Sequence, residues 1–83
     1  MEEMKVLNTY KNTENETVFV TNYGDFTKKR IGNEPGFQTY LVTILSGRWP
    51  NEYALGVFCD ARYAALGGSI SIGESTATVT CNS

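Results

Sequence analysis

The stretch from Phe37 to Leu45 constrains the fold most, because it is apolar on both faces when it is read as a β-strand. One face carries Phe37, Thr39, Leu41, Thr43 and Leu45, and the other carries Tyr40, Val42 and Ile44. Side chains of a strand alternate between its two faces, and apolar residues on both faces are typical of a central strand. The sequence therefore predicts a sheet with this segment as a central strand.

More strands are predicted before and after this segment. Residues 5–10 and the β-branched and aromatic run 17–23 are predicted to pair as a hairpin across the polar, Asn-rich stretch 11–16. Near the C-terminus, residues 69–72 and 76–81 alternate around Gly73-Glu74-Ser75 and predict a second hairpin, with its threonines facing water.

Two segments are predicted to lie outside regular structure. Residues 1–3 are expected to be a frayed tail. Gly24-Asp25 is expected to end the second strand, and residues 24–36 combine charges with Gly32-Asn33 and Glu34-Pro35-Gly36. Because such a density of breakers and charges is typical of loops, residues 24–36 are predicted to form a long exposed loop.

One helix is predicted from Asn51 to Leu66. Asn51 is a favourable N-cap, and Gly67-Gly68 is a stop signal. Helical spacing aligns one apolar stripe of Leu55, Phe58, Cys59, Tyr63 and Leu66. Gly56 weakens a helix by about 1 kcal/mol relative to alanine, and residues 53–59 also alternate, so a strand at 53–59 is the alternative.

These elements predict an α+β domain with about five strands, in the chain order strand-strand-strand-helix-strand-strand, and one helix packed on one face of an antiparallel sheet. If residues 53–59 form a strand, the alternative is a small all-β barrel or sandwich. A chain of 83 residues has room for one core, so residues 1–83 are expected to form a single domain. Small domains are marginally stable, and homodimerisation would stabilise this one further.

Charge and targeting signals narrow the function classes. The net charge of -2, from 7 basic and 9 acidic side chains, is too balanced for a duplex-binding protein. No apolar stretch approaches the roughly 18 residues of a membrane span, and the N-terminus does not read as a signal peptide. We therefore expect a cytoplasmic protein without a membrane partner, in which Cys59 and Cys81 are reduced and packed like small hydrophobic residues.

The residues that usually carry catalysis are missing or badly placed. The chain has no histidine, which excludes Ser-His and Cys-His nucleophile pairs and imidazole-based zinc sites. Cys59 lies near Arg62 but falls on the apolar stripe, which predicts an inert thiol. Residues 68–75 have the glycine spacing of a phosphate-binding loop, but Glu74 stands where that motif needs lysine. We expect no enzyme activity, no cofactor and no metal.

Two groups of residues are candidates for binding a partner. Lys28, Lys29 and Arg30 form the one basic run, and the aromatic residues Tyr23, Phe26, Phe37 and Tyr40 flank it. Cations with aromatics can hold single-stranded nucleic acid, and the alternative is a solvated loop. Arg48, Trp49 and Tyr53 are residue types enriched in interface hot spots, although Trp49 is equally suited to cover the core.

By elimination, the sequence predicts a protein-binding module, most simply a small inhibitor or adaptor. It would occlude a site on a larger partner through residues 24–36 and the Arg48-Trp49 turn. In size and composition alone, the chain resembles the host-takeover and anti-defence inhibitors of bacteriophages, which would place it in a host cytoplasm. The first alternative is a weak single-stranded nucleic-acid binder that uses residues 28–30. The second is a self-assembling structural subunit.

Overall fold

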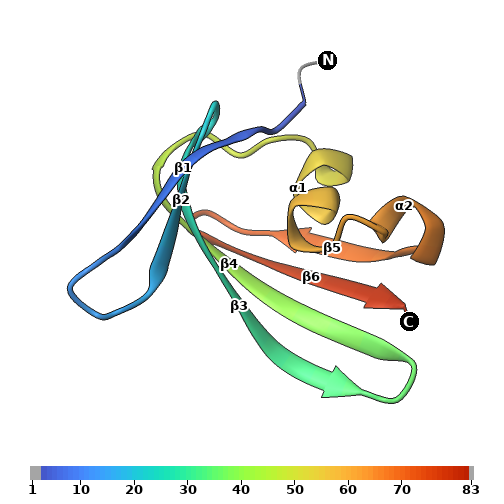
Figure 1. Ribbon diagram of the computed structural model, residues 1–83. Coiled ribbons are helices and arrows are strands. Elements are labelled where there is room, and N and C mark those ends of the chain that lie inside the picture. The colour runs from blue at the N-terminus through green and yellow to red at the C-terminus, as the bar shows by residue number, and fades with distance from the viewer. Residues whose placement is uncertain (1–2, 83) are drawn as a thin grey trace.

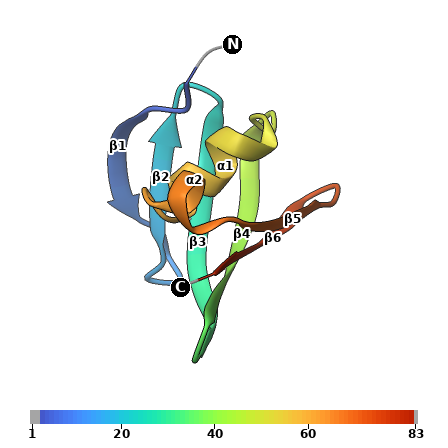
Figure 2. The same ribbon diagram turned by 90° about the vertical axis from the view of Figure 1, so that its right-hand side faces the viewer.

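The computed structural model describes residues 3–82, and its strands form one antiparallel sheet in the order β1-β2-β3-β4-β6-β5 (Figure 1). The strands are β1 (Val6–Lys11), β2 (Thr17–Thr21), β3 (Gly24–Glu34), β4 (Phe37–Gly47), β5 (Gly68–Ile72) and β6 (Thr76–Asn82). Two short helices, α1 (Glu52–Cys59) and α2 (Tyr63–Leu66), lie on the same face of the sheet (Figure 2). The structure is thus a six-stranded sheet with two short helices, which agrees with the predicted α+β class but has one more strand and one more helix.

The predicted central strand is confirmed. β4 pairs with β3 on one side and with β6 on the other. Val42 has no exposed surface, and Tyr40 and Ile44 pack against the same core. The helices contribute Leu55 and other apolar side chains to this core, which therefore lies between the sheet and the helices.

The predicted loop at residues 24–36 is wrong, because residues 24–34 form β3. A tight turn at Pro35-Gly36 joins β3 to β4, and Gly36 has a φ of +98°. Proline at the first central position and a positive-φ glycine at the second are the signature of a type II turn. The register shifts between Arg30 and Gly32, which makes Ile31 the extra residue of a β-bulge. The charged and glycine residues that suggested a loop therefore lie along an exposed, bulged strand.

Both predicted hairpins are confirmed. β1 pairs with β2, and the Asn12 side-chain oxygen accepts the backbone amides of Glu14 and Glu16 in the turn between them. β5 pairs with β6. Along β6, Ala77, Val79 and Cys81 are buried, whereas Thr76 and Thr78 are exposed and Thr80 is half-buried.

The ends of two predicted segments differ from the structure. β2 ends at Thr21 rather than at residue 23, because the Thr21 hydroxyl donates to the Gly24 carbonyl at 2.8 Å and closes a turn to β3. Of the predicted tail, residues 1–2 lie outside the described residues. The carbonyl of Glu3 accepts a hydrogen bond from the side-chain amide of Asn22 at 2.8 Å.

The prediction of one continuous helix from Asn51 to Leu66 is wrong, because the structure has two short helices in this range. Asn51 is the N-cap as predicted, since its side-chain oxygen accepts the Ala54 amide at 2.7 Å. The helix breaks at Asp60, which has an extended backbone and a carboxylate that accepts the Arg62 amide at 2.9 Å. The alternative strand at 53–59, and the all-β barrel or sandwich built on it, are also wrong.

The predicted apolar stripe survives the break in the helix. Leu55 and Cys59 belong to the buried core, and Phe58, Tyr63 and Leu66 pack against it. Gly56 explains how both helices fit, because a Cβ atom at this position would lie 2.5 Å from Cδ1 of the Tyr63 ring. The glycine that weakens α1 as a helix therefore lets α2 pack closely against it.

We expect Gly56→Ala to lower the free energy of unfolding by about 1–3 kcal/mol, although alanine favours helix formation, because the Tyr63 ring must move. Urea denaturation followed by circular dichroism measures the change. In a Tyr63→Ala background the obstacle is gone, and the same substitution should be neutral or stabilising. Equal losses in both backgrounds would contradict the proposed contact.

The two cysteines are buried free thiols. Burial raises the pKa of Cys59 from 9.0 to about 12, and the charge of Lys28 offsets part of this effect. Burial also raises the pKa of Cys81 and of Tyr63. The thiol of Cys59 is therefore a packed, protonated group at neutral pH and a poor nucleophile.

These raised pKa values predict a loss of stability at alkaline pH. Above about pH 9 the unfolded Cys59 thiol releases its proton while the folded thiol keeps it until about pH 12. The stability should therefore fall by up to about 1.4 kcal/mol per pH unit from this group alone. Burial lowers the pKa of Lys28 below its usual value of 10.5. Below pH 10.5 this group therefore makes the stability rise with pH, in opposition to Cys59. Urea denaturation at increasing pH should show a shallower decline for Cys59→Ala, and parallel declines would refute the assignment.

Candidate functional site

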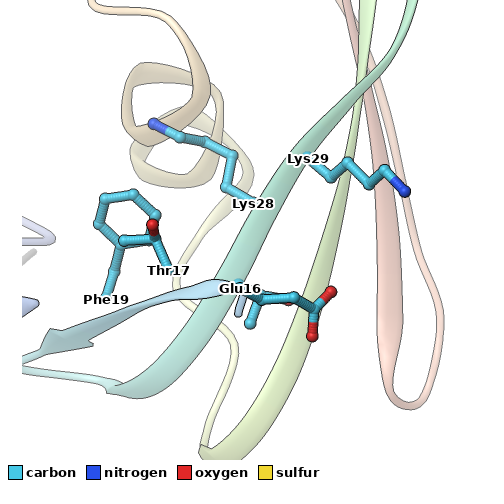
Figure 3. Close-up of a pocket in the computed structure, with 6 residues that line it drawn as sticks. Glu16, Thr17, Phe19, Lys28 and Lys29 are labelled. Atoms are coloured by element: carbon cyan, nitrogen blue, oxygen red, sulfur yellow. The ribbon is translucent and has the colours of Figure 1, made fainter. Parts of the chain in front are cut away.

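The predicted basic cluster is divided between the two faces of β3. Lys28 points toward the helices and Lys29 points to the other side of the strand (Figure 3). Arg30 lies opposite Tyr40 in the register with β4 and so shares the face of Lys28. Lys29 and Arg30 are exposed, whereas Lys28 is half-buried. The three residues thus do not form one basic patch.

Lys28 links the sheet to α1. Its ammonium nitrogen lies 5.0 Å from the ring centre of Phe19 and 4.6 Å from that of Phe58. It also donates a hydrogen bond of 2.8 Å to the Phe58 carbonyl in the last turn of α1. A cation is favourable at the C-terminal end of a helix. Burial nevertheless lowers the pKa of Lys28, against the opposing charges of Cys59 and Asp60.

The aromatic residues around the basic run are mostly committed to packing. Phe26 has no exposed surface and Tyr23 is buried in the core. Tyr40 is half-buried, and its hydroxyl donates to the side-chain oxygen of Gln38 at 2.9 Å. Phe37 is the most accessible of the four, with 37% of its surface exposed. Because base stacking needs open ring faces, Tyr23 and Phe26 cannot serve a nucleic-acid site.

The second predicted group lies outside β3, in the segment that leads into α1 and in the first turn of that helix. Arg48 is exposed, and its guanidinium carbon lies 4.3 Å from the ring centre of Tyr23. Trp49 is half-buried against Phe26, with ring centres 5.5 Å apart, so it covers the core. Tyr53 is 62% exposed on α1. These residues lie at the start of α1, whereas the outer half of β3 runs away from it toward the 34–37 turn (Figure 1).

The structure reveals a feature that the sequence analysis missed, which is a free edge in the middle of the sheet. β2 has five residues and β3 has eleven, and their pairing extends only from Thr21–Gly24 to Val18–Thr27. From Lys29 to Glu34, β3 therefore pairs with β4 alone among the described strands. The outer half of the β3–β4 hairpin extends beyond β1 and β2 (Figure 2), whereas β6 accompanies β4 as far as Phe37. We call the segment Lys29–Glu34 the β3 free edge.

A hollow marks the point where β2 and β3 separate. It has a volume of about 300 Å³ and is lined by Glu16, Thr17, Phe19, Thr27, Lys28 and Lys29 (Figure 3). The hollow adjoins the inner end of the β3 free edge. Its lining combines the Phe19 ring and the Lys28 stem with two threonines and two exposed charges.

Exposed side chains make the β3 free edge accessible. Lys29, Arg30, Asn33 and Glu34 are exposed, and Ile31 exposes 54% of its surface at the bulge. The sequence signal that could have indicated β3 is Glu34-Pro35-Gly36-Phe37, a turn sequence that is compatible with a hairpin and so with a strand before it.

The groups that could take part in chemistry or binding can be named for the described residues. No group of three or more His, Cys, Asp or Glu side chains that could hold a metal occurs within residues 3–82. In the same residues, no helix is both long and apolar enough to cross a membrane. The two thiols are buried, and the accessible side chains of the candidate site are Lys29, Arg30, Ile31, Asn33 and Glu34.

Comparisons with known proteins give no relative from which a role could be transferred. No family model matches the chain, and no curated protein or solved structure matches it either. The function must therefore be argued from the residues themselves.

The two neighbouring lysines give a matched test of the structural role of Lys28. We expect Lys28→Ala to lower the free energy of unfolding by about 1–3 kcal/mol, because it removes the packed stem and the hydrogen bond to Phe58. Lys29→Ala, on the other face, should change it by less than about 0.5 kcal/mol. Lys28→Met keeps the stem and removes a desolvated charge, so it should recover most of the loss. Equal effects of the two alanine variants in urea denaturation would contradict this role.

Proposed function

We propose that this chain is a non-catalytic protein-binding module, a small inhibitor or adaptor, that binds an extended segment of a larger partner along the β3 free edge. The observation that carries the proposal is the pairing of Lys29–Glu34 with β4 alone among the described strands. A strand edge offers unpaired backbone donors and acceptors to another chain. Addition of one strand would complete the sheet at this position.

The support behind the β3 free edge favours this use. β4 holds β3 on its inner side, and β4 itself is paired with β6 from Phe37 to Thr43. The edge is therefore held in place by the paired strands behind it and does not need to become ordered on binding. Preorganisation of this kind lowers the entropic cost of association.

The position of the edge inside the sheet also distinguishes it from the two outer edges at β1 and β5. β2 pairs with the inner half of β3 only. The first residue of β2, Thr17, lies at the hollow. A bound segment would thus meet β3 along its length and the lining of the hollow at its end. The bulge at Ile31 interrupts a regular ladder, which disfavours indiscriminate strand pairing.

The proposed site keeps part of the surface that the sequence indicated. Lys29 and Arg30 remain partner-binding residues, and Lys28 contributes through the lining of the hollow. Arg48, Trp49 and Tyr53 lie outside it. The proposed compartment is the cytoplasm, or the host cytoplasm if a bacteriophage encodes the chain, where Cys59 and Cys81 would stay reduced.

Site-specific photocrosslinking tests the proposal. A photoreactive amino acid at Ile31, introduced into the protein in its source cells, should give a discrete adduct with one larger protein. The same probe at Ser71 is the matched control and should give no such adduct. Ser71 is exposed on β5, one of the two outer strands of the sheet. Adducts of equal yield from both positions, or none from Ile31, would refute binding at the β3 free edge.

A further inference from the structure

We infer that the partner segment carries two consecutive acidic residues, which pair with Lys29 and Arg30 on opposite faces of the sheet, and an apolar residue that enters the hollow. This inference rests on the proposed function, since it specifies the chemistry of the segment that is added to the β3 free edge.

The order of the two acidic residues follows from the register of β3. Lys29 lies opposite Leu41, and Arg30 lies opposite Tyr40. Directly opposed residues share a face and successive residues alternate, so the two cations project from different faces. A strand added to β3 alternates in the same way. Its two anionic side chains must therefore be adjacent in sequence to meet one cation on each face.

The distribution of charge around the edge fixes where the acidic pair belongs. Lys29 and Arg30 are both exposed. Glu34 lies at the outer end of the edge, and Glu16 lines the hollow at the inner end. Acidic residues of the partner would be repelled by Glu34 at the outer end and attracted by Lys29 and Arg30, and Glu16 offsets part of the lysine charge at the hollow. The positive section of the edge is thus limited to the Lys29–Arg30 step.

The hollow calls for a different side chain. Its lining includes the ring of Phe19 and the stem of Lys28, whose ammonium group is already bonded to the Phe58 carbonyl. The aliphatic part of a lysine and an aromatic ring form an apolar surface. An apolar residue of the partner segment therefore fits the hollow.

Three short synthetic peptides test the inference against the folded protein. The first has an extended Thr-Val sequence that contains a Glu-Glu doublet, the second replaces the doublet by Gln-Gln, and the third separates the two glutamates by one threonine. Amide NMR spectra report binding through the signals of Lys29–Glu34. We expect the doublet peptide to bind roughly threefold to tenfold more tightly than either control, as expected for two exposed ion pairs.

A charge exchange supplies the matched variant. In Lys29→Glu combined with Arg30→Glu, both at exposed positions, the preference should move from the Glu-Glu peptide to a Lys-Lys peptide. Circular dichroism checks that the variant is folded. Retention of the Glu-Glu preference in this variant would overturn the assignment of the two cations.

The remaining outcomes separate the two proposals. Equal affinities of all peptides, with shifts confined to Lys29–Glu34, would overturn the acidic doublet and leave strand addition standing. If no peptide perturbs these amides, both proposals fail. A single-stranded oligothymidine that shifts the same amides at lower concentration than any peptide would assign the edge to nucleic acid and overturn the inference.

Discussion

The long antiparallel pairing of β3 with β4 is the constraint on which the other features depend. The turn at Pro35-Gly36 joins two strands of eleven residues each. The inner half of this hairpin carries Phe26 and Val42 into the core and supports the helices. Its outer half extends past the five-residue β2, and that difference in length creates the β3 free edge. Core and candidate site therefore arise from one hairpin.

Lys28 shows how neighbouring cations in one run can acquire different roles. Alternation along β3 turns Lys28 toward Phe19 and Phe58, where its ammonium group bonds to the end of α1. The same alternation turns Lys29 into solvent on the other face. Partial burial of the charged Lys28 ammonium group costs free energy, and the lowered pKa of this group has the same cause. The packing of its stem and its hydrogen bond offset that cost.

Local patterns in the sequence were sufficient for most of the fold. Alternation identified β4, β5 and β6, and the Asn51 cap and the apolar stripe identified the helical region. The patterns failed where two signals conflicted. Charges and glycines in residues 24–36 outweighed the Pro-Gly turn, which is why β3 was predicted as a loop. The break at Asp60 depends on hydrogen bonds of its carboxylate to Arg62, which periodicity does not reveal.

The candidate site was less accessible to sequence reasoning than the fold. Lys29 and Arg30 could be selected as exposed cations and Trp49 as a candidate to cover the core, but Lys28 was assigned to packing only by the structure. The free edge itself depends on where β2 ends relative to β3, which is a relation between two strands. Only the tertiary register contains that information.

The outer strand β1 raises the question of self-assembly, since Val6, Leu7 and Tyr10 are exposed on it. Val6 lies opposite Thr21 and Tyr10 opposite Val18, with a bulge at Leu7 between them. Thr21 and Val18 are on different faces of β2, so Val6 and Tyr10 are too. Antiparallel pairing of two copies keeps each face on its own side, so Val6 of one copy cannot pack on Tyr10 of the other. The bulge thus prevents Val6 and Tyr10 from forming one apolar stripe on a single face of β1.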